Sequence, residues 1–189
     1  MKKKISIAEP FIDNSEWKSI KKPLSSGWLT QGKQVSQFEK VFSKIHRMEL
    51  SSATTSCTTA LHLGLIAFGI KKGDEVVVPA FTWISTANVV EFCGAKPIFA
   101  DVDPRTFNLD LNDVKKKITK KTKAVIAVHL FGLCCDIIKL KKILPTNVKI
   151  LEDAACSTGS TYNGKFSGNI GDAAAFSFHP RKIITTGEG

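Results

Sequence analysis

From residue 74 onward, short apolar runs alternate with amphipathic stretches, and this alternation limits the fold more than any other feature. The run EVVVPA at 75–80 is continuously β-branched, as is typical of a strand buried on both faces. The same reasoning predicts further strands at 96–102, 124–132, 148–155 and 173–178, and helices at 82–92, 111–118 and 137–144. Strands separated by helices predict an α/β domain with a mostly parallel sheet flanked by helices.

The first third of the chain is predicted to be largely helical. Residues 5–13 read as extended, and a helix follows that Ser15 would cap and that ends near Gly27. Apolar residues at helical spacing predict a second helix over 35–45. A third is predicted over 59–68, with Gly69 as its C-terminal cap.

The composition is that of an ordinary globular protein with an excess of lysine. A length of 189 residues predicts one domain with one core. Much of the net charge of +10 lies in lysine runs that read first as solvated faces. An anionic substrate is a second reading, and nucleic acid a weaker third, because the chain lacks a recognisable nucleic-acid module. We therefore expect no nucleic-acid partner.

The cysteines indicate a reducing compartment. Their number, five, is odd, and none forms a CxxC pair, which argues against a disulfide framework and against a metal site of the zinc type. The basic start MKKKISIAEPF is interrupted by Glu9, Pro10 and Asp13, so it does not read as a signal peptide. No run approaches the roughly 20 apolar residues of a membrane span. We expect a soluble, cytoplasmic protein without a membrane partner.

Several residues with chemical potential follow the predicted strands. In open parallel sheets, ligands bind at the carboxyl ends of the strands. The residues brought to this edge are Trp83, His129, Asp153, Ser177 and Lys182. No GxGxxG motif follows any strand, so a dinucleotide site is not expected.

Lys182 and Asp153 together suggest pyridoxal phosphate. Lys182 lies among apolar residues, which suits a partly buried amine, although in a lysine-rich chain a surface turn is the plain alternative. Asp153, taken alone, reads more readily as a helix N-cap. As a pair they supply the lysine for a Schiff base and the acid for the pyridinium nitrogen of that cofactor.

Two further requirements of that cofactor have candidates. Hydroxyl residues crowd 51–59 before a helix, where they can cap the helix or, with the free N–H groups there, bind phosphate; alone, this pattern favours the cap. Thr58 and Ser177 could supply hydroxyls to a phosphate. Trp83 could stack on the ring, or equally belong to the core.

Seven colinear motifs resemble the pyridoxal-phosphate-dependent nucleotide-sugar aminotransferases of the DegT/DnrJ/StrS group, which have the aspartate-aminotransferase fold type I. They are SGWLTQG (26–32), SCTTALHL (56–63), GDEVVVPAFTWISTANVV (73–90), GAKPIFADVDPRTFNLD (94–110), VHLFG (128–132), EDAACSTGSTYNGK (152–165) and GDAAAFSFHPRKIITTGEG (171–189).

The resemblance implies a role for each site residue. Lys182 would attach the cofactor and move the substrate proton, and Asp153 would keep the pyridinium nitrogen protonated. Trp83 would stack on the ring. The phosphate would be bound by Thr58, Ser177 and the backbone N–H of Cys57, a position where many relatives carry Gly. Cys156 occupies a place near the ring hydroxyl where relatives commonly carry Gln or His.

The resemblance also implies the reaction. An amino group would pass, from glutamate in such enzymes, to a keto group of a nucleotide-linked sugar, in polysaccharide or amino-sugar biosynthesis. Similar dehydratases carry histidine in place of this lysine, so Lys182 favours the aminotransferase. A homodimer is expected of the full-length enzyme.

Relatives of this group continue well beyond the TTGEG turn. We therefore expect residues 1–189 to comprise an N-terminal segment and most of the cofactor-binding large domain, truncated before a small C-terminal domain. The alternative is a truncated, non-catalytic remnant that acts only as a partner subunit of a full-length relative.

Overall fold

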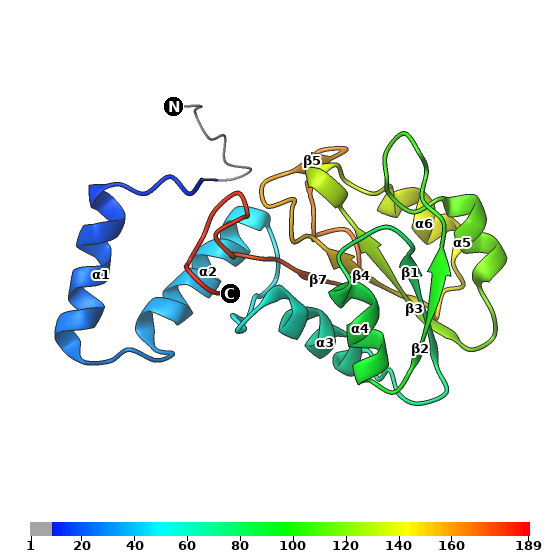
Figure 1. Cartoon of the computed structure of the whole chain (residues 1–189), viewed down its shortest axis with the longest axis horizontal. Coiled ribbons are helices and arrows are strands. Elements are labelled where there is room, and N and C mark those ends of the chain that lie inside the picture. The colour runs from blue at the N-terminus through cyan, green and yellow to red at the C-terminus, as the bar shows by residue number, and fades with distance from the viewer. Residues whose placement is uncertain (1–8) are drawn as a thin grey trace, which may run out of the picture.

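A five-stranded parallel sheet forms the centre of the computed structural model, which describes residues 9–189 (Figure 1). The strands lie in the order β2-β1-β3-β4-β7, and every neighbouring pair is parallel. Their bounds are β1 Glu75–Pro79, β2 Lys96–Ala100, β3 Thr122–Val128, β4 Lys149–Asp153 and β7 Ala173–Ala175. The predicted α/β class with a mostly parallel sheet is confirmed.

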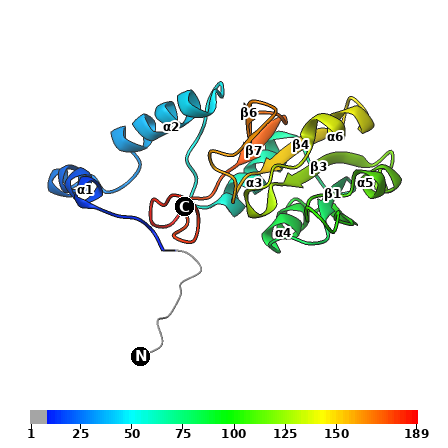
Figure 2. The same cartoon turned by 90° about the horizontal axis from the view of Figure 1, so that it is seen from above.

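Helices cover both faces of this sheet. The α3 helix (Cys57–Ala67) and α4 (Ser85–Phe92) pack on the face that carries Val76, Val78 and Leu151. The opposite face is covered by α5 (Leu111–Lys117) and α6 (Ile137–Ile143). Figure 2 shows α4 and α6 on opposite sides of the strands. Because β-strand side chains alternate between faces, each central strand contributes to two separate apolar layers, as its β-branched run predicted.

Several predicted boundaries are wrong at the carboxyl edge of the sheet. The β3 strand ends at Val128 instead of continuing to residue 132, because the chain turns into the short 3-10 helix η1 (Leu130–Gly132). Within this turn Phe131 has a φ of 55° and Gly132 a φ of 86°, values incompatible with a strand. The α4 helix begins at Ser85, three residues later than predicted, because the chain first bends at residues 80–82 after β1. Likewise, β7 ends at Ala175.

A small hairpin after β4 was not predicted. It consists of β5 (Thr161–Tyr162) and β6 (Lys165–Phe166), which pair in antiparallel register. Its turn contains Asn163 and Gly164, both with positive φ. An Asn-Gly pair is a strong signal for a two-residue hairpin turn, and it stands in the sequence, but no alternating strands flank it.

The first helix, α1 (Asn14–Ser26), is capped by Asp13, not by Ser15 as predicted. The Asp13 carboxylate accepts a hydrogen bond from the Ser15 N–H at 2.6 Å, and the Glu16 carboxylate accepts one from the Asp13 N–H at 2.8 Å, which completes a capping box. The helix stops at Gly27, as expected. Part of the predicted extended segment, residues 5–8, lies outside the described residues. No helix in the described part of the chain is long and apolar enough to cross a membrane.

The second helix, α2 (Lys33–His46), is joined to the segment that follows β7 by aromatic contacts. The Phe42 ring meets the Phe176 ring edge to face at 4.9 Å and the Phe178 ring at 5.5 Å. Figure 1 shows the last segment of the chain, in red, running beside α2. These contacts fix the approach of the chain toward Lys182.

The third helix starts two residues earlier than predicted. Ser56 is its N-cap, and the Ser56 hydroxyl accepts a hydrogen bond from the Thr59 N–H at 3.1 Å. The capping role considered for the hydroxyl-rich stretch is therefore confirmed at Ser56. Gly69 has a φ of 76° just past the helix, in agreement with its predicted place at the C-terminal end.

We predict that Phe42→Ala lowers the free energy of unfolding by about 3 kcal/mol, because it leaves a cavity among several aromatic rings. The matched control is Phe11→Ala, which removes a ring that is 86% exposed and should change stability by less than about 0.5 kcal/mol. Urea unfolding followed by circular dichroism measures both. Equal effects of the two substitutions would show that α2 does not pack as described.

Candidate functional site

Asp153 is the last residue of β4 and points to the same side of the sheet as Leu151, toward α3 and α4. One carboxylate oxygen accepts a hydrogen bond from the Thr86 hydroxyl at 3.1 Å, and the other accepts one from the Ala155 N–H at 3.2 Å. The residue is only 5% exposed. No helix begins here, so the reading of Asp153 as a helix N-cap is wrong.

The environment of Asp153 disfavours its charge. Burial raises the pKa of Asp153 above its ordinary value, and the hydrogen bonds from Ala155 and Thr86 oppose this only in part. The nearby charge of Lys182 acts in the same lowering direction. A buried carboxylate with few donors gains most from an additional positively charged or hydrogen-bonding partner.

Lys182 lies on the turn after β7, half-buried, with its amine directed at Cys156. The Lys182 Nζ atom is 3.2 Å from the Cys156 Sγ atom. The Cys57 Sγ atom lies 4.0 Å from the Asp153 Oδ1 atom. The structure thus gathers four of the predicted site residues, Cys57, Asp153, Cys156 and Lys182, around the carboxyl ends of β4 and β7.

The N-terminus of α3 forms one wall of this region. Cys57 and Thr58 are the first two residues of the helix, where backbone N–H groups have no partner within the helix. Because Ser56 caps the N–H of Thr59, the N–H groups of Cys57 and Thr58 are the ones left for a ligand. The α3 helix packs against Ala173 and Ala175 of β7, the strand that leads to Ser177.

Ser177 and Trp83 differ sharply in exposure. Ser177 is 6% exposed, and its hydroxyl accepts a weak hydrogen bond from the His179 N–H at 3.4 Å. Trp83 follows β1 at the carboxyl edge and is 74% exposed, so it does not belong to the core. An exposed indole at this edge is available to a planar ligand.

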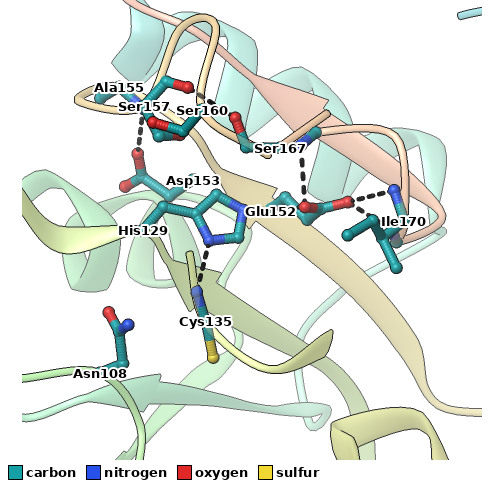
Figure 3. A network of polar contacts seen from close by, with 12 residues as sticks. Asn108, His129, Cys135, Glu152, Asp153, Ala155, Ser157, Ser160, Ser167 and Ile170 are labelled. Carbon is teal, nitrogen blue, oxygen red and sulfur yellow. Dashed lines mark hydrogen bonds and ion pairs between the residues drawn. The ribbon is translucent and has the colours of Figure 1, made fainter. Parts of the chain in front are cut away.

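A second, fully buried polar network lies beside Asp153 and was not predicted (Figure 3). Glu152 points to the opposite side of β4, and its carboxylate accepts a hydrogen bond from the His129 Nε2–H at 2.8 Å. It also accepts hydrogen bonds from the N–H groups of Gly168 at 2.9 Å and Ile170 at 2.8 Å, and from that of Gly171. Both Glu152 and His129 are 0% exposed.

The position of the His129 hydrogen follows from its two contacts. The His129 Nδ1 atom accepts a hydrogen bond from the Cys135 N–H at 2.9 Å, which places the ring hydrogen on Nε2, facing Glu152. The Glu152 carboxylate therefore has four donors. Burial pushes the pKa of Glu152 up, but the hydrogen bonds from His129, Gly171 and Gly168 outweigh it, and the pKa lies below its ordinary value.

From the sequence, His129 is expected at the sheet edge without a role, and the buried Glu152 is not predicted. The available signal was a glutamate within an otherwise apolar strand, since an ionisable residue in a buried strand needs dedicated partners. The partners could not be identified, because three of them are backbone groups of the turn at 168–171. At Gly171 an added Cβ would lie 2.8 Å from the Ile150 carbonyl oxygen, so this close approach requires glycine.

Residues 10–189 match the DegT/DnrJ/EryC1/StrS aminotransferase family. The chain belongs to this family. It is 45% identical to the GDP-perosamine synthase of Caulobacter vibrioides over 188 residues, which is 98% of this chain and 51% of that protein. The chain thus spans about half the length of the curated relatives that it matches.

Solved structures of an aminotransferase and of a sugar dehydratase superimpose closely on this chain. The aminotransferase from Psychrobacter cryohalolentis has a TM-score of 0.91 and 34% identity, covering 96% of this chain and 47% of that one. The GDP-4-keto-6-deoxy-D-mannose-3-dehydratase of E. coli with bound hydrated PLP has a TM-score of 0.94 and 32% identity, covering 98% of this chain and 49% of that one. The predicted fold type is confirmed by these similarities.

We predict that Glu152→Gln lowers the free energy of unfolding by about 3 kcal/mol. The substitution removes the charge that the surrounding N–H groups stabilise, and it places the NH2 group of the Gln side chain against some of those N–H groups. The lowered pKa means that the charge stabilises the fold above the ordinary value of 4.5 and that this contribution is lost as the pH falls further. The variant should lack this part of the acid sensitivity. Glu91→Gln, at an exposed position on α4, is the control and should be nearly neutral.

Asp153→Asn should have the opposite effect on the cofactor-free chain. The pKa of Asp153 is raised in the folded chain, so ionisation of this carboxyl destabilises the fold. The free energy of unfolding therefore falls as the pH rises from the ordinary value of 3.8 through the folded-state value. The Asn variant should therefore be more stable than the parent at neutral pH, by a margin that shrinks toward acid. Urea unfolding over a pH series measures this margin, and a variant that is weaker at every pH would contradict the assignment.

Proposed function

We propose that this chain carries the cofactor site of a pyridoxal-phosphate-dependent aminotransferase that transfers an amino group to the keto group of a nucleotide-linked sugar. The observation that carries the proposal is the convergence of two groups at one edge of the sheet, beside the N-terminus of α3. They are the Lys182 amine, 3.2 Å from the Cys156 sulfur, and the buried Asp153 carboxylate, which the Thr86 hydroxyl binds. The family membership supports the same reaction.

The donor set of the site fits this cofactor. An amine, a desolvated carboxylate, free helix N–H groups and a buried hydroxyl match its aldehyde, ring nitrogen and phosphate. Lys182 would hold it covalently, and Asp153 would accept the hydrogen bond from the ring nitrogen. The N–H groups of Cys57 and Thr58, with the hydroxyls of Thr58 and Ser177, would bind the phosphate.

The residues of the chain divide the remaining work between them. Pyridoxal phosphate supplies an electron sink that stabilises negative charge at the substrate carbon. The Lys182 amine is the group that removes and returns the proton at that carbon. Burial disfavours the ionised form of the Asp153 carboxyl, so a positively charged partner stabilises it. The carboxylate therefore favours a protonated ring nitrogen. Trp83, exposed at the edge, would cover one ring face, and Cys156 would lie near the ring hydroxyl.

The substrate class rests on the relatives. The Caulobacter vibrioides and Vibrio cholerae proteins that resemble the chain are GDP-perosamine synthases, which supports a nucleotide-linked sugar as amino acceptor. Glutamate is the proposed amino donor, and a homodimer the proposed assembly. A lysine at position 182 favours amino transfer over the dehydration carried out by the E. coli relative. The five free thiols suit a reducing compartment, and we place the enzyme in the cytoplasm.

The direct test is to incubate the purified chain with pyridoxal phosphate, reduce it with borohydride and map the adduct by mass spectrometry. We expect the cofactor to be fixed on Lys182, and Lys182→Ala to retain none at that position. Lys165→Ala, which removes an exposed lysine on β6, is the matched control and should retain full labelling. Labelling spread over surface lysines, or unchanged by Lys182→Ala, would reject the proposed function.

A further inference from the structure

Cys156 and Lys182 form a contact between a thiol and an amine. The sulfur lies 3.2 Å from the amine nitrogen, and both side chains are half-buried. They come from different segments, the turn after β4 and the turn after β7, and each segment is anchored by main-chain contacts. Ala154 donates its N–H to Ala175 at 2.8 Å, and the Lys182 N–H binds the His179 carbonyl at 2.9 Å. The two reactive atoms are thus held together by the fold.

The other four thiols are in settings that suppress their reactivity. Burial raises the pKa of Cys135 to about 12. Burial, followed by the charge of Asp153, raises the pKa of Cys57 well above its ordinary value. The pKa values of Cys93 and Cys134 are raised as well, chiefly by burial. Because the thiolate is the form that reacts with oxidants, these four thiols should react slowly.

We propose that Cys156 is an oxidation site whose product is a covalent sulfur–nitrogen bridge to Lys182. The bridge consumes the amine that the proposed function requires, so it closes the site to pyridoxal phosphate. This regulatory role rests on the proposed function, whereas the bridge itself rests only on the contact between the two side chains.

The chemistry needs one equivalent of a hydroperoxide, with hydrogen peroxide as the simplest case. The Cys156 sulfur attacks the peroxide, the O–O bond breaks, and the sulfur is oxidised to a sulfenic acid while the peroxide is reduced to water. The Lys182 nitrogen then attacks this sulfur, an N–S bond forms and the S–O bond breaks. The leaving hydroxide takes a proton from the nitrogen and departs as a second water. Sulfenic acids undergo the same condensation with backbone nitrogen.

The bridge is reversible by thiols. Two molecules of a small thiol return the Cys156 thiol and the Lys182 amine and are themselves oxidised to one disulfide. The site would thus reopen when reducing conditions return. Bound pyridoxal phosphate would protect the site, because it occupies the same amine.

The test is to treat the cofactor-free chain with hydrogen peroxide and map its tryptic peptides by mass spectrometry. Peptide 150–165 contains Cys156 as its only cysteine, and peptide 182–189 begins with Lys182. We expect these two peptides to be joined, lighter than their sum by two hydrogen atoms, and to separate with dithiothreitol. Borohydride fixation of pyridoxal phosphate on Lys182 should fall in proportion to bridging and recover after dithiothreitol.

Variants separate this proposal from the alternatives. Cys156→Ser should form no bridge, and Cys134→Ser, which removes another half-buried thiol, should bridge like the parent. Lys182→Ala should let Cys156 continue to sulfinic acid, and circular dichroism checks that each variant is folded. Unmodified Cys156, sulfinic acid in the parent, or a Cys57–Cys156 disulfide would overturn the proposal. Because the bridge is scored by mass alone, its outcome is independent of whether the untreated chain binds the cofactor.

Discussion

The buried charge of Glu152 is the most demanding requirement in this fold. An unpaired carboxylate inside a protein costs several kcal/mol, so it persists only where donors surround it. Here the donors come from the end of β3, through His129, and from the turn that leads into β7. They converge only when β3, β4 and β7 lie side by side in the observed register. Asp153 follows Glu152 on β4, and β7 leads to Lys182, so the network that fixes the pairing of β4 with β7 also fixes the two segments that carry these residues.

Two neighbouring carboxylates on β4 show how alternation along a strand separates structure from reactivity. Glu152 faces the side of α5 and α6, where four donors lower its pKa. Asp153 faces the side of α3 and α4, where burial exceeds the effect of two hydrogen bonds and raises its pKa. The difference lies in the number of donors rather than in exposure. The hydrogen bonds of Glu152 are all supplied by the protein, whereas Asp153 can accept a further hydrogen bond from a ligand.

The sequence was sufficient for the class of the sheet and for the edge at which the site lies. Apolar strands such as EVVV that are separated by helices are compatible with few folds other than a parallel sheet with helices on both faces. It was not sufficient for element ends, because η1 and the start of α4 depend on the turns that follow β3 and β1. The Asp13 cap was missed in favour of Ser15, a choice that propensity alone does not decide. The buried site of Glu152 was not predicted because its partners are mostly backbone groups, whose positions cannot be read from residue types. The contact of Cys156 with Lys182 joins residues 26 positions apart and appears only once β4 and β7 pair.

We propose that the ends of β4 and β7 hold Asp153 and Lys182 as two anchors of one cofactor. A crystal structure of the chain after reduction with pyridoxal phosphate and borohydride tests this most directly. We expect continuous density from the Lys182 nitrogen to the cofactor, with the cofactor's ring nitrogen within hydrogen-bonding distance of the Asp153 carboxylate. A cofactor attached to Lys182 whose ring nitrogen faces any other group, or attached to another lysine, would contradict it.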